Sequence, residues 1–219
     1  MKKLYMLIAM VILTLPAFSQ GAQKDTSNRE RKNIISVDLT ALLRQFSNAQ
    51  TNFYGSPYYI AYRRVIKNCA IKLQAGGEIY TNNTVMNDSI KGMQSRNMLN
   101  LALGFEHYTY LGKRWTLYHG VDLTYAYLGN TYVNDRTTTN SYESKDHQNN
   151  YGLAPALGIV FKITDRISIG TETSYNVSYM ISKTERLEIP NSQYNRVINE
   201  TGIQSQFIPP TAINLRLKF

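Results

Sequence analysis

The sequence predicts an all-β protein, an eight-stranded antiparallel up-and-down transmembrane β-barrel. Three observations predict this fold: apolar residues recur at every second position, most of these runs exceed the strand length of soluble sheets, and short and long connections alternate. The 219 residues are 43% hydrophobic and 18% charged, which excludes a disordered chain. The single cysteine excludes an intramolecular disulfide and a cysteine-based zinc or iron–sulfur site.

The N-terminus has the pattern of a secretory signal peptide in residues 1–19. Lys2 and Lys3 precede a mostly apolar run, and the small residues Ala17 and Ser19 stand where a signal peptidase would cut. Residues 20–32 are polar and without period, so we expect a flexible lead-in, and residues 33–219 form the predicted barrel. Export of such a barrel predicts a location in the outer membrane of a Gram-negative bacterium.

Each predicted strand has one apolar register and one polar or small register. Leu101, Leu103 and Phe105, for example, alternate with Ala102 and Gly104. Because successive strand residues point to opposite faces, one side of such a strand is apolar and the other is not. The eight predicted strands are residues 33–43, 58–66, 69–81, 96–110, 115–128, 151–163, 167–182 and 207–219.

Three of these strands carry a departure from the pattern. Arg63 and Arg64 are adjacent, so the register of strand 58–66 stays open. Pro155 lacks an N–H for the ladder and predicts a bulge in strand 151–163. Pro209 and Pro210 stand near the start of the last strand, where proline is tolerated.

The lengths of the connections are sorted by position. Short turns separate the strands near Lys67, Gly112 and Asp165. Outer-membrane barrels have short periplasmic turns and longer external loops, whereas a soluble sandwich has no reason to sort its loops in this way. The long connections are rich in Asn, Thr, Ser, Gln and Tyr and span residues 44–57, 82–95, 129–150 and 183–206.

The last strand ends in an alternating apolar pattern, with Leu215, Leu217 and Phe219 on one register. In its architecture and in this final strand, the chain resembles the small bacterial outer-membrane β-barrels of the OmpA, OmpX and OmpW type. The resemblance covers nearly all of the mature chain. It implies that Leu215, Leu217 and Phe219 form the signal for the barrel-assembly machinery, although Asn214 stands where that signal often has glycine. It also implies outer-membrane lipid and lipopolysaccharide as surroundings.

Charged residues on the polar register are predicted to face the lumen. An eight-stranded barrel is only wide enough to be filled by side chains, so opposite charges there would pair across the interior. An ion path or an acid–base site is the alternative interpretation of the same residues. The predicted lumen charge network consists of Asp38, Lys72, Glu78, Glu106, Asp122, Lys162, Glu172 and Arg216.

Aromatic residues on the apolar register predict two girdles at the membrane–water interfaces, because Tyr and Trp favour that boundary. The alternative is the general preference of aromatic residues for strands. Trp115 and Phe161 stand at short-turn ends, and Tyr127, Tyr151 and Tyr179 stand at long-loop ends.

The sequence offers little support for catalysis. His107 and His119 would share the outward face of neighbouring strands, while His147 lies in a predicted loop beside Asp146. No Gly-x-Ser-x-Gly elbow and no metal-ligand spacing accompanies them. We therefore predict no catalytic residue, no cofactor site and no metal site. The dispersed positive charges and the exported location also argue against nucleic-acid binding.

The predicted role is structural or surface interaction through the long external loops, with an unidentified extracellular ligand. Tyr132, Tyr142 and Tyr194 are the candidate contact residues. A narrow porin-like conduit and a lipid-modifying outer-membrane enzyme are the alternatives within the membrane. A soluble periplasmic barrel of lipocalin type is a further alternative, in which the apolar register would face a ligand cavity.

Overall fold

The computed structural model describes residues 32–39, 58–87, 90–136, 141–189, 195–210 and 212–219. These residues belong to one compact unit, Lys32–Phe219. The predicted signal peptide, most of the lead-in and Tyr194 lie outside the described residues. Within the described part of the chain, no helix has the length and apolar character needed to cross a bilayer.

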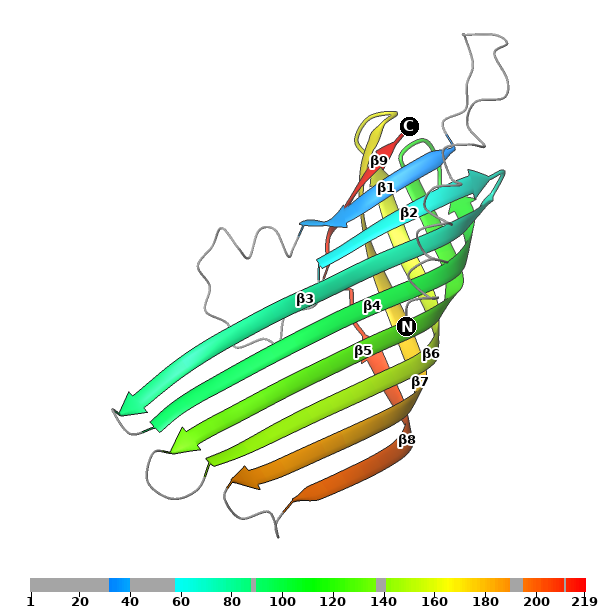
Figure 1. The fold of residues 1–219 in the computed structure, drawn as a ribbon. Coiled ribbons are helices and arrows are strands. Elements are labelled where there is room, and N and C mark those ends of the chain that lie inside the picture. The colour runs from blue at the N-terminus through cyan, green and yellow to red at the C-terminus, as the bar shows by residue number, and fades with distance from the viewer. Residues whose placement is uncertain (1–31, 40–57, 88–89, 137–140, 190–194, 211) are drawn as a thin grey trace, which may run out of the picture. The chain divides into compact units, whose positions relative to one another are not determined.

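The described residues form nine antiparallel strands (Figure 1). Their bounds are β1 (Asn33–Asp38), β2 (Tyr58–Ile66), β3 (Cys69–Asn87), β4 (Ile90–Tyr110), β5 (Trp115–Arg136), β6 (Ser141–Lys162), β7 (Ile167–Ile189), β8 (Arg196–Ile208) and β9 (Asn214–Lys218).

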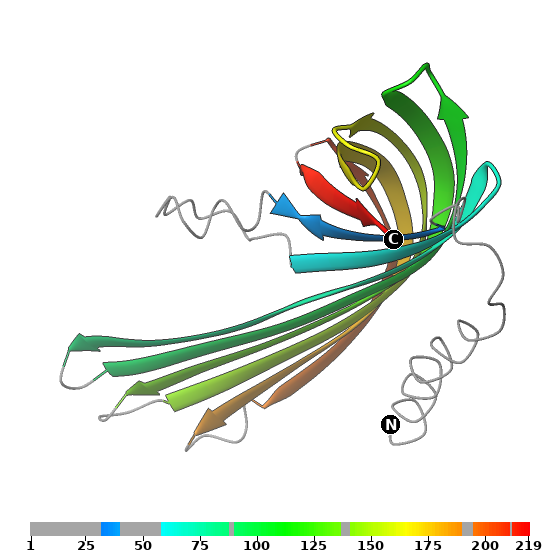
Figure 2. The ribbon, with the colours of Figure 1, turned by 90° about the horizontal axis from the view of Figure 1, so that it is seen from above.

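The strands form a closed ring of hydrogen-bonded neighbours. Consecutive strands pair from β1 to β7, β7 pairs with β9, and β9 pairs with β1. Seen from above, the red C-terminal strand therefore lies beside the blue N-terminal strand (Figure 2). This closure confirms the predicted antiparallel β-barrel.

The last predicted strand is divided in two, which corrects its predicted bounds. β8 pairs with β7 from Ser174 to Arg186, and β9 pairs with β7 from Ile167 to Gly170. Pro209 and Pro210 lie in the break between β8 and β9. Two consecutive residues without an N–H cannot continue the ladder, so the break falls at the prolines rather than before them.

The predicted long connections are wrong in three of four places, because the strands continue through most of them. β3 to β8 extend together past the ends of the shorter strands β1, β2 and β9 (Figure 1). Residues 82–95, 129–150 and 183–206 are therefore mainly strand, and the predicted loop 44–57 lies outside the described residues. The last pair between β2 and β3 is Tyr58 with Gly77. The part of β3–β8 that begins two residues beyond this pair is named the projecting sheet. It comprises residues 79–87, 90–97, 129–136, 141–147, 183–189 and 196–199.

Pro155 does not produce the predicted bulge. On the β5 side it stays in register opposite Val121. On the β7 side, the pairs Leu153–Val177 and Ala156–Ser174 keep the same register across a short gap in the ladder. The missing N–H therefore removes local pairing without inserting a residue. The bulge in the described ladders lies instead between Val85 and Asn87, where β3 meets β4.

The apolar register faces outward and the charged register faces inward. Leu103, Leu123 and Leu153 are 50%, 59% and 56% exposed, whereas Lys72 and Glu106 are 0% and 1% exposed. A lipocalin-type barrel requires the opposite arrangement, with apolar side chains around an internal cavity. The structure therefore excludes that alternative.

Candidate functional site

The site is the interior of the barrel, where alternation turns every second side chain inward. Small residues on the inward register, such as Ala70 and Ala154, leave room for long charged side chains from other strands. Two glycines show how tight the space is. A Cβ at Gly104 would overlap the carboxylate of Asp122, and a Cβ at Gly158 would overlap the ring of Tyr118.

Lys72 of β3 lies at the centre of a group of carboxylates. Its Nζ is 2.6 Å from Asp122 Oδ2, 3.4 Å from Glu172 Oε1 and 3.7 Å from Glu106 Oε1. Glu106 and Asp122 come from the next two strands, but Glu172 comes from β7, which is not a neighbour of β3 in the ring. The contact with Glu172 therefore crosses the lumen.

Arg63 of β2 supplies the second cation. Its Nε lies 3.0 Å from both carboxylate oxygens of Glu106, and its Nη1 donates a hydrogen bond of 2.5 Å to Ser36 Oγ. Its Nη2 is 3.8 Å from Glu172 Oε2. A guanidinium offers several donors in one plane, so this single side chain joins β1, β4 and β7.

Arg216 of β9 supplies the third cation and contacts Tyr118. Its Nη2 donates to the Tyr118 hydroxyl at 2.7 Å, and its guanidinium lies over the Tyr118 ring, 4.6 Å from the centroid. Tyr118 in turn donates to Glu172 Oε2 at 2.8 Å. Tyr108 closes the other side of the group with a 2.6 Å hydrogen bond to Glu106 Oε2.

These residues are named the interior ion cluster, and their formal charges cancel. The cluster comprises the cations Arg63, Lys72 and Arg216, the carboxylates Glu106, Asp122 and Glu172, and the hydroxyl residues Ser36, Tyr108 and Tyr118. Burial of an unpaired charge is costly, so an equal number of cations and carboxylates is what a water-poor interior requires. Within the cluster, side chains from strands on opposite sides of the ring meet across the lumen.

Five of the predicted lumen residues belong to this cluster, and three do not. Asp38 is buried beside it and lines the cavity described below. Glu78 lies further along β3, and no hydrogen-bond partner for its Oε2 is found among the described residues. The lumen prediction for Lys162 is wrong: its exposed ammonium lies 2.5 Å from Asp165 in the β6–β7 turn. Lys162 is the last residue of β6, where the strand has already left the interior.

Sequence reasoning missed Arg63, although a signal for it was present. The turn at Lys67 and Asn68 is so short that it fixes which residues of β2 and β3 are opposite. In that register Arg63 pairs with Lys72, and opposite residues in an antiparallel pair share a face. An inward Lys72 therefore requires an inward Arg63 and an outward Arg64, which the structure shows as buried and exposed.

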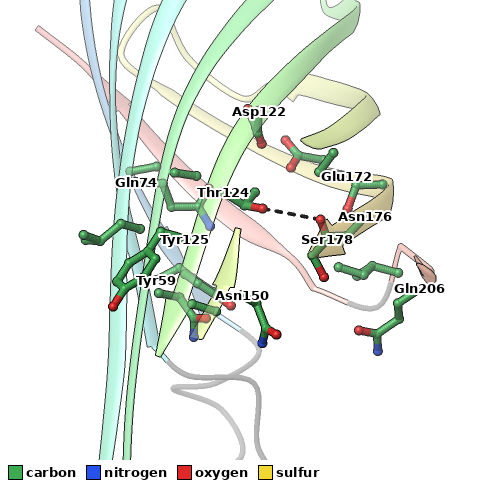
Figure 3. Close-up of a pocket in the computed structure, with 18 of the residues that line it drawn as sticks. Tyr59, Gln74, Asp122, Thr124, Tyr125, Asn150, Glu172, Asn176, Ser178 and Gln206 are labelled. Carbon is green, nitrogen blue, oxygen red and sulfur yellow. Dashed lines mark hydrogen bonds between the residues drawn. The ribbon is translucent and has the colours of Figure 1, made fainter. Parts of the chain in front are cut away.

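A polar cavity of about 490 Å³ adjoins the interior ion cluster (Figure 3). Asp122 and Glu172 of the cluster form part of its wall. Further along the strands Asp38 and Arg96 line it together with many amide and hydroxyl side chains. Thr124 Oγ1 donates to Asn176 Oδ1 at 3.4 Å. Amide and hydroxyl groups hydrogen-bond water and polar solutes. They include Gln74, Asn100, Asn150, Ser178 and Gln206.

The predicted girdle residues lie at two levels on the outer face. Trp115 and Phe161 are opposite each other at the short-turn ends of β5 and β6, with ring centroids 4.8 Å apart. Tyr151 and Tyr179 are opposite each other ten residues further along β6 from Phe161. At about 3.3 Å per residue and a tilt of about 40°, the two levels are separated by about 25 Å along the barrel axis.

Tyr127 stands two residues beyond the second aromatic level. Its hydroxyl lies 3.0 Å from Nδ1 of His147, and the two rings are stacked with centroids 6.3 Å apart. The sequence predicts His147 in a loop, but the residue belongs to β6 and pairs with Gly129. The physical reason is the continuation of β5 and β6 into the projecting sheet.

The outward histidines form a pair on neighbouring strands. His107 and His119 are opposite each other, with ring centroids 5.2 Å apart, and Cys69 pairs with His107 on the other side. Among the described residues, no group of three or more His, Cys, Asp or Glu side chains is placed to hold a metal ion. The predicted assembly signal also faces outward, since Leu217 and Phe219 are 49% and 50% exposed and Leu215 is on the same register.

Comparison with known proteins adds a distant structural similarity. No family model matches the chain, and no curated protein matches its sequence. Among solved structures, the chain is similar to the ferric yersiniabactin uptake receptor FyuA from Yersinia pestis, with a TM-score of 0.46 and 10% sequence identity. The similarity covers 73% of this chain and 26% of the receptor, so the chain spans about a quarter of that receptor's length.

Proposed function

We propose that this chain is an integral outer-membrane β-barrel with a closed lumen, whose role is structural or surface interaction through the projecting sheet. The observation that carries the proposal is that the same strands form two different surfaces, an apolar barrel exterior and a polar projecting sheet. The barrel has an apolar exterior about as tall as the apolar band of outer-membrane barrels, which is about 25 Å. The same strands then continue as a polar sheet beyond that band.

The membrane location rests on the exposed apolar side chains. On β6, Leu153 and Leu157 are 56% and 48% exposed, and on β5 Val121 and Leu123 are 45% and 59% exposed. These residues lie between the two aromatic levels, on neighbouring strands. A continuous apolar surface of this kind is unfavourable in water and favourable against acyl chains.

The interaction role rests on the composition of the projecting sheet. Tyr132 and Tyr142 have ring centroids 5.7 Å apart, and the Arg186 guanidinium lies 5.0 Å from the centroid of Tyr142. Tyr132 is 39% exposed. Exposed tyrosine and arginine side chains on a rigid sheet are typical of contact surfaces. The proposed partners are outer-membrane lipid and lipopolysaccharide around the barrel, the barrel-assembly machinery during insertion, and an extracellular ligand at this surface.

Heat-modifiable mobility tests the barrel and its location together. The full chain is expressed in a Gram-negative host, membranes are fractionated, and samples are run on denaturing gels with and without boiling. We expect the protein in the outer-membrane fraction, with different mobilities for boiled and unboiled samples. Recovery of the mature chain in the soluble periplasmic fraction without detergent would contradict the proposal.

The closed lumen is tested by conductance. A conduit is the second candidate function, because the polar cavity reaches the interior ion cluster from one side. We expect no stable conductance steps from the wild-type protein in planar bilayers, since the cluster blocks the passage. The double variant Arg63→Ala/Arg216→Ala removes two side chains that cross the lumen and is expected to show steps if it remains heat-modifiable. Regular steps from the wild type would favour the conduit.

We also propose that the protein is not an enzyme and uses no cofactor. Among the described residues, the His107–His119 pair is the feature that favours the lipid-modifying alternative, since it faces outward. Mass spectrometry of lipid A and phospholipids from cells with and without the protein tests this point. Lipids altered by the wild type but not by a His107→Ala/His119→Ala variant would show catalysis.

A further inference from the structure

The short-turn end of the barrel carries an unusual concentration of positive charge. Eight lysine and arginine side chains stand in the three short turns and at the adjoining strand ends, and all eight are exposed. Among the described residues of these turns and strand ends, Asp165 is the only one with an acidic side chain. This group is named the cationic rim and comprises Lys32, Arg64, Lys67, Lys113, Arg114, Lys162, Arg166 and Lys218.

Backbone hydrogen bonds show that these residues belong to one continuous end of the barrel. Val65 N donates to the Lys32 carbonyl, Lys162 N donates to the Arg114 carbonyl, and Lys218 N donates to the Arg166 carbonyl, each at 2.7 to 2.8 Å. Asn33 and Phe219 exchange two further backbone hydrogen bonds between β1 and the chain after β9. The cations are therefore distributed around the circumference rather than gathered on one side.

The other parts of the molecule have a much smaller excess of positive charge or none. The interior ion cluster has equal numbers of cations and carboxylates. In the projecting sheet, acidic and basic side chains are interleaved and paired: Lys145 with Glu143 at 2.9 Å, Lys183 with Glu185 at 2.5 Å, and Arg186 with Glu188 at 3.1 Å. Among the described residues of the rim, one ion pair is found: Lys162 pairs with Asp165.

The cationic rim directly adjoins the apolar exterior. Leu111, Trp115 and Ile163 stand in or beside the same turns and are 53%, 47% and 50% exposed. Long basic side chains next to an apolar surface can keep their stems against acyl chains while their charged ends reach the headgroup level. The rim therefore has the geometry of a headgroup contact.

We infer that the cationic rim binds the phosphates of anionic glycerophospholipids in the leaflet at which the short turns lie. This inference rests on the proposed membrane location. A ring of separated cations fits an annulus of many small anionic ligands. A folded acidic partner would instead need the charges on one face of the rim. Electrostatic attraction of this kind grows with the number of basic residues near the surface.

Spin-label lipid selectivity tests the inference on the full, folded protein. The protein is reconstituted in phosphatidylcholine vesicles, and the bound fraction of spin-labelled phosphatidylglycerol is compared with that of spin-labelled phosphatidylcholine. The rim variant is Lys67→Asn/Lys113→Gln/Arg114→Gln/Arg166→Gln; asparagine replaces Lys67 because its φ is 56°. The matched control, Lys145→Gln/Lys183→Gln/Arg186→Gln/Arg196→Gln, removes the same charge from the projecting sheet.

We expect the wild type and the control to bind phosphatidylglycerol in preference to phosphatidylcholine, and the rim variant to lose that preference at least roughly threefold. Added salt should weaken the wild-type preference. Equal binding of both lipids by the wild type, or equal losses in the two variants, would overturn the inference. Retention of soluble peptidoglycan fragments by the wild type without lipid selectivity would also overturn it, in favour of a periplasmic polymer. Failure to enter the vesicles at all would count against the membrane location instead.

Discussion

The barrel and the projecting sheet are built from the same strands but in different surroundings. In the barrel, one face of each strand meets buried charges and the other is apolar and exposed, so the sequence alternates strongly. In the projecting sheet, polar residues occupy both faces, as in Thr81, Asn82 and Asn83 of β3. The comparison shows that a sequence alternates between apolar and polar residues where the two faces of a strand meet different surroundings. A strand can continue beyond that region, and the alternation is then lost.

The largest expected difference between the two regions concerns their charges. Lys72→Met removes the central cation of the interior ion cluster and leaves three buried carboxylates with two cations, which should lower the free energy of unfolding by about 3–5 kcal/mol. Lys183→Met removes an exposed partner of Glu185 in the projecting sheet and should change the free energy of unfolding far less, because solvent screens a surface ion pair. Trp115 fluorescence during urea unfolding in vesicles measures both values. Equal effects of the two variants would show that the cluster is not buried as described.

A somewhat smaller difference is expected for a charge introduced on the outer faces. Leu123 is 59% exposed between the aromatic levels, so Leu123→Arg would place a guanidinium against acyl chains and cost about 2–4 kcal/mol in a bilayer. Tyr132→Arg makes a similar change in the projecting sheet and should be close to neutral. The same unfolding assay in vesicles measures these effects. A tolerated Leu123→Arg together with normal folding in water would contradict the membrane location.

The sequence predicted the barrel better than the projecting sheet for the same physical reason. Strand 58–66 and the turns 67–68 and 111–114 have the predicted bounds, because turn residues mark them, and the third short turn begins one residue earlier than predicted, at Ile163. Segments 129–150 and 183–206 lack apolar alternation, so the sequence predicts loops there, whereas the structure has strands. In the candidate site, the alternation of each strand predicts which carboxylates face inward. The contact of Lys72 with Glu172 depends on barrel closure, which no local sequence pattern encodes. Lys162 was misplaced because alternation does not show where a strand leaves the interior.

The smallest expected effect concerns the Lys183–Glu185 ion pair of the projecting sheet. The Lys183 ammonium hydrogen-bonds and attracts the Glu185 carboxylate, which holds the pKa of Glu185 below its ordinary value. Lys183→Gln should therefore raise the pKa of Glu185 toward that value, as measured by carbon-13 NMR titration of the labelled side chain.

The effect of this pKa on stability has a definite sign. A carboxylate whose pKa is lowered by folding stabilises the folded state at pH values above its unfolded-state pKa. This stabilisation is lost as the pH falls through the folded-state pKa. Because the Lys183–Glu185 pair lies at the surface, with side chains 50% and 32% exposed, the midpoint of urea unfolding at neutral pH should be the same in the variant and the wild type. A clear shift of that midpoint would show that charges in the projecting sheet contribute to stability as those of the interior ion cluster do, and the contrast between the two regions would then fail.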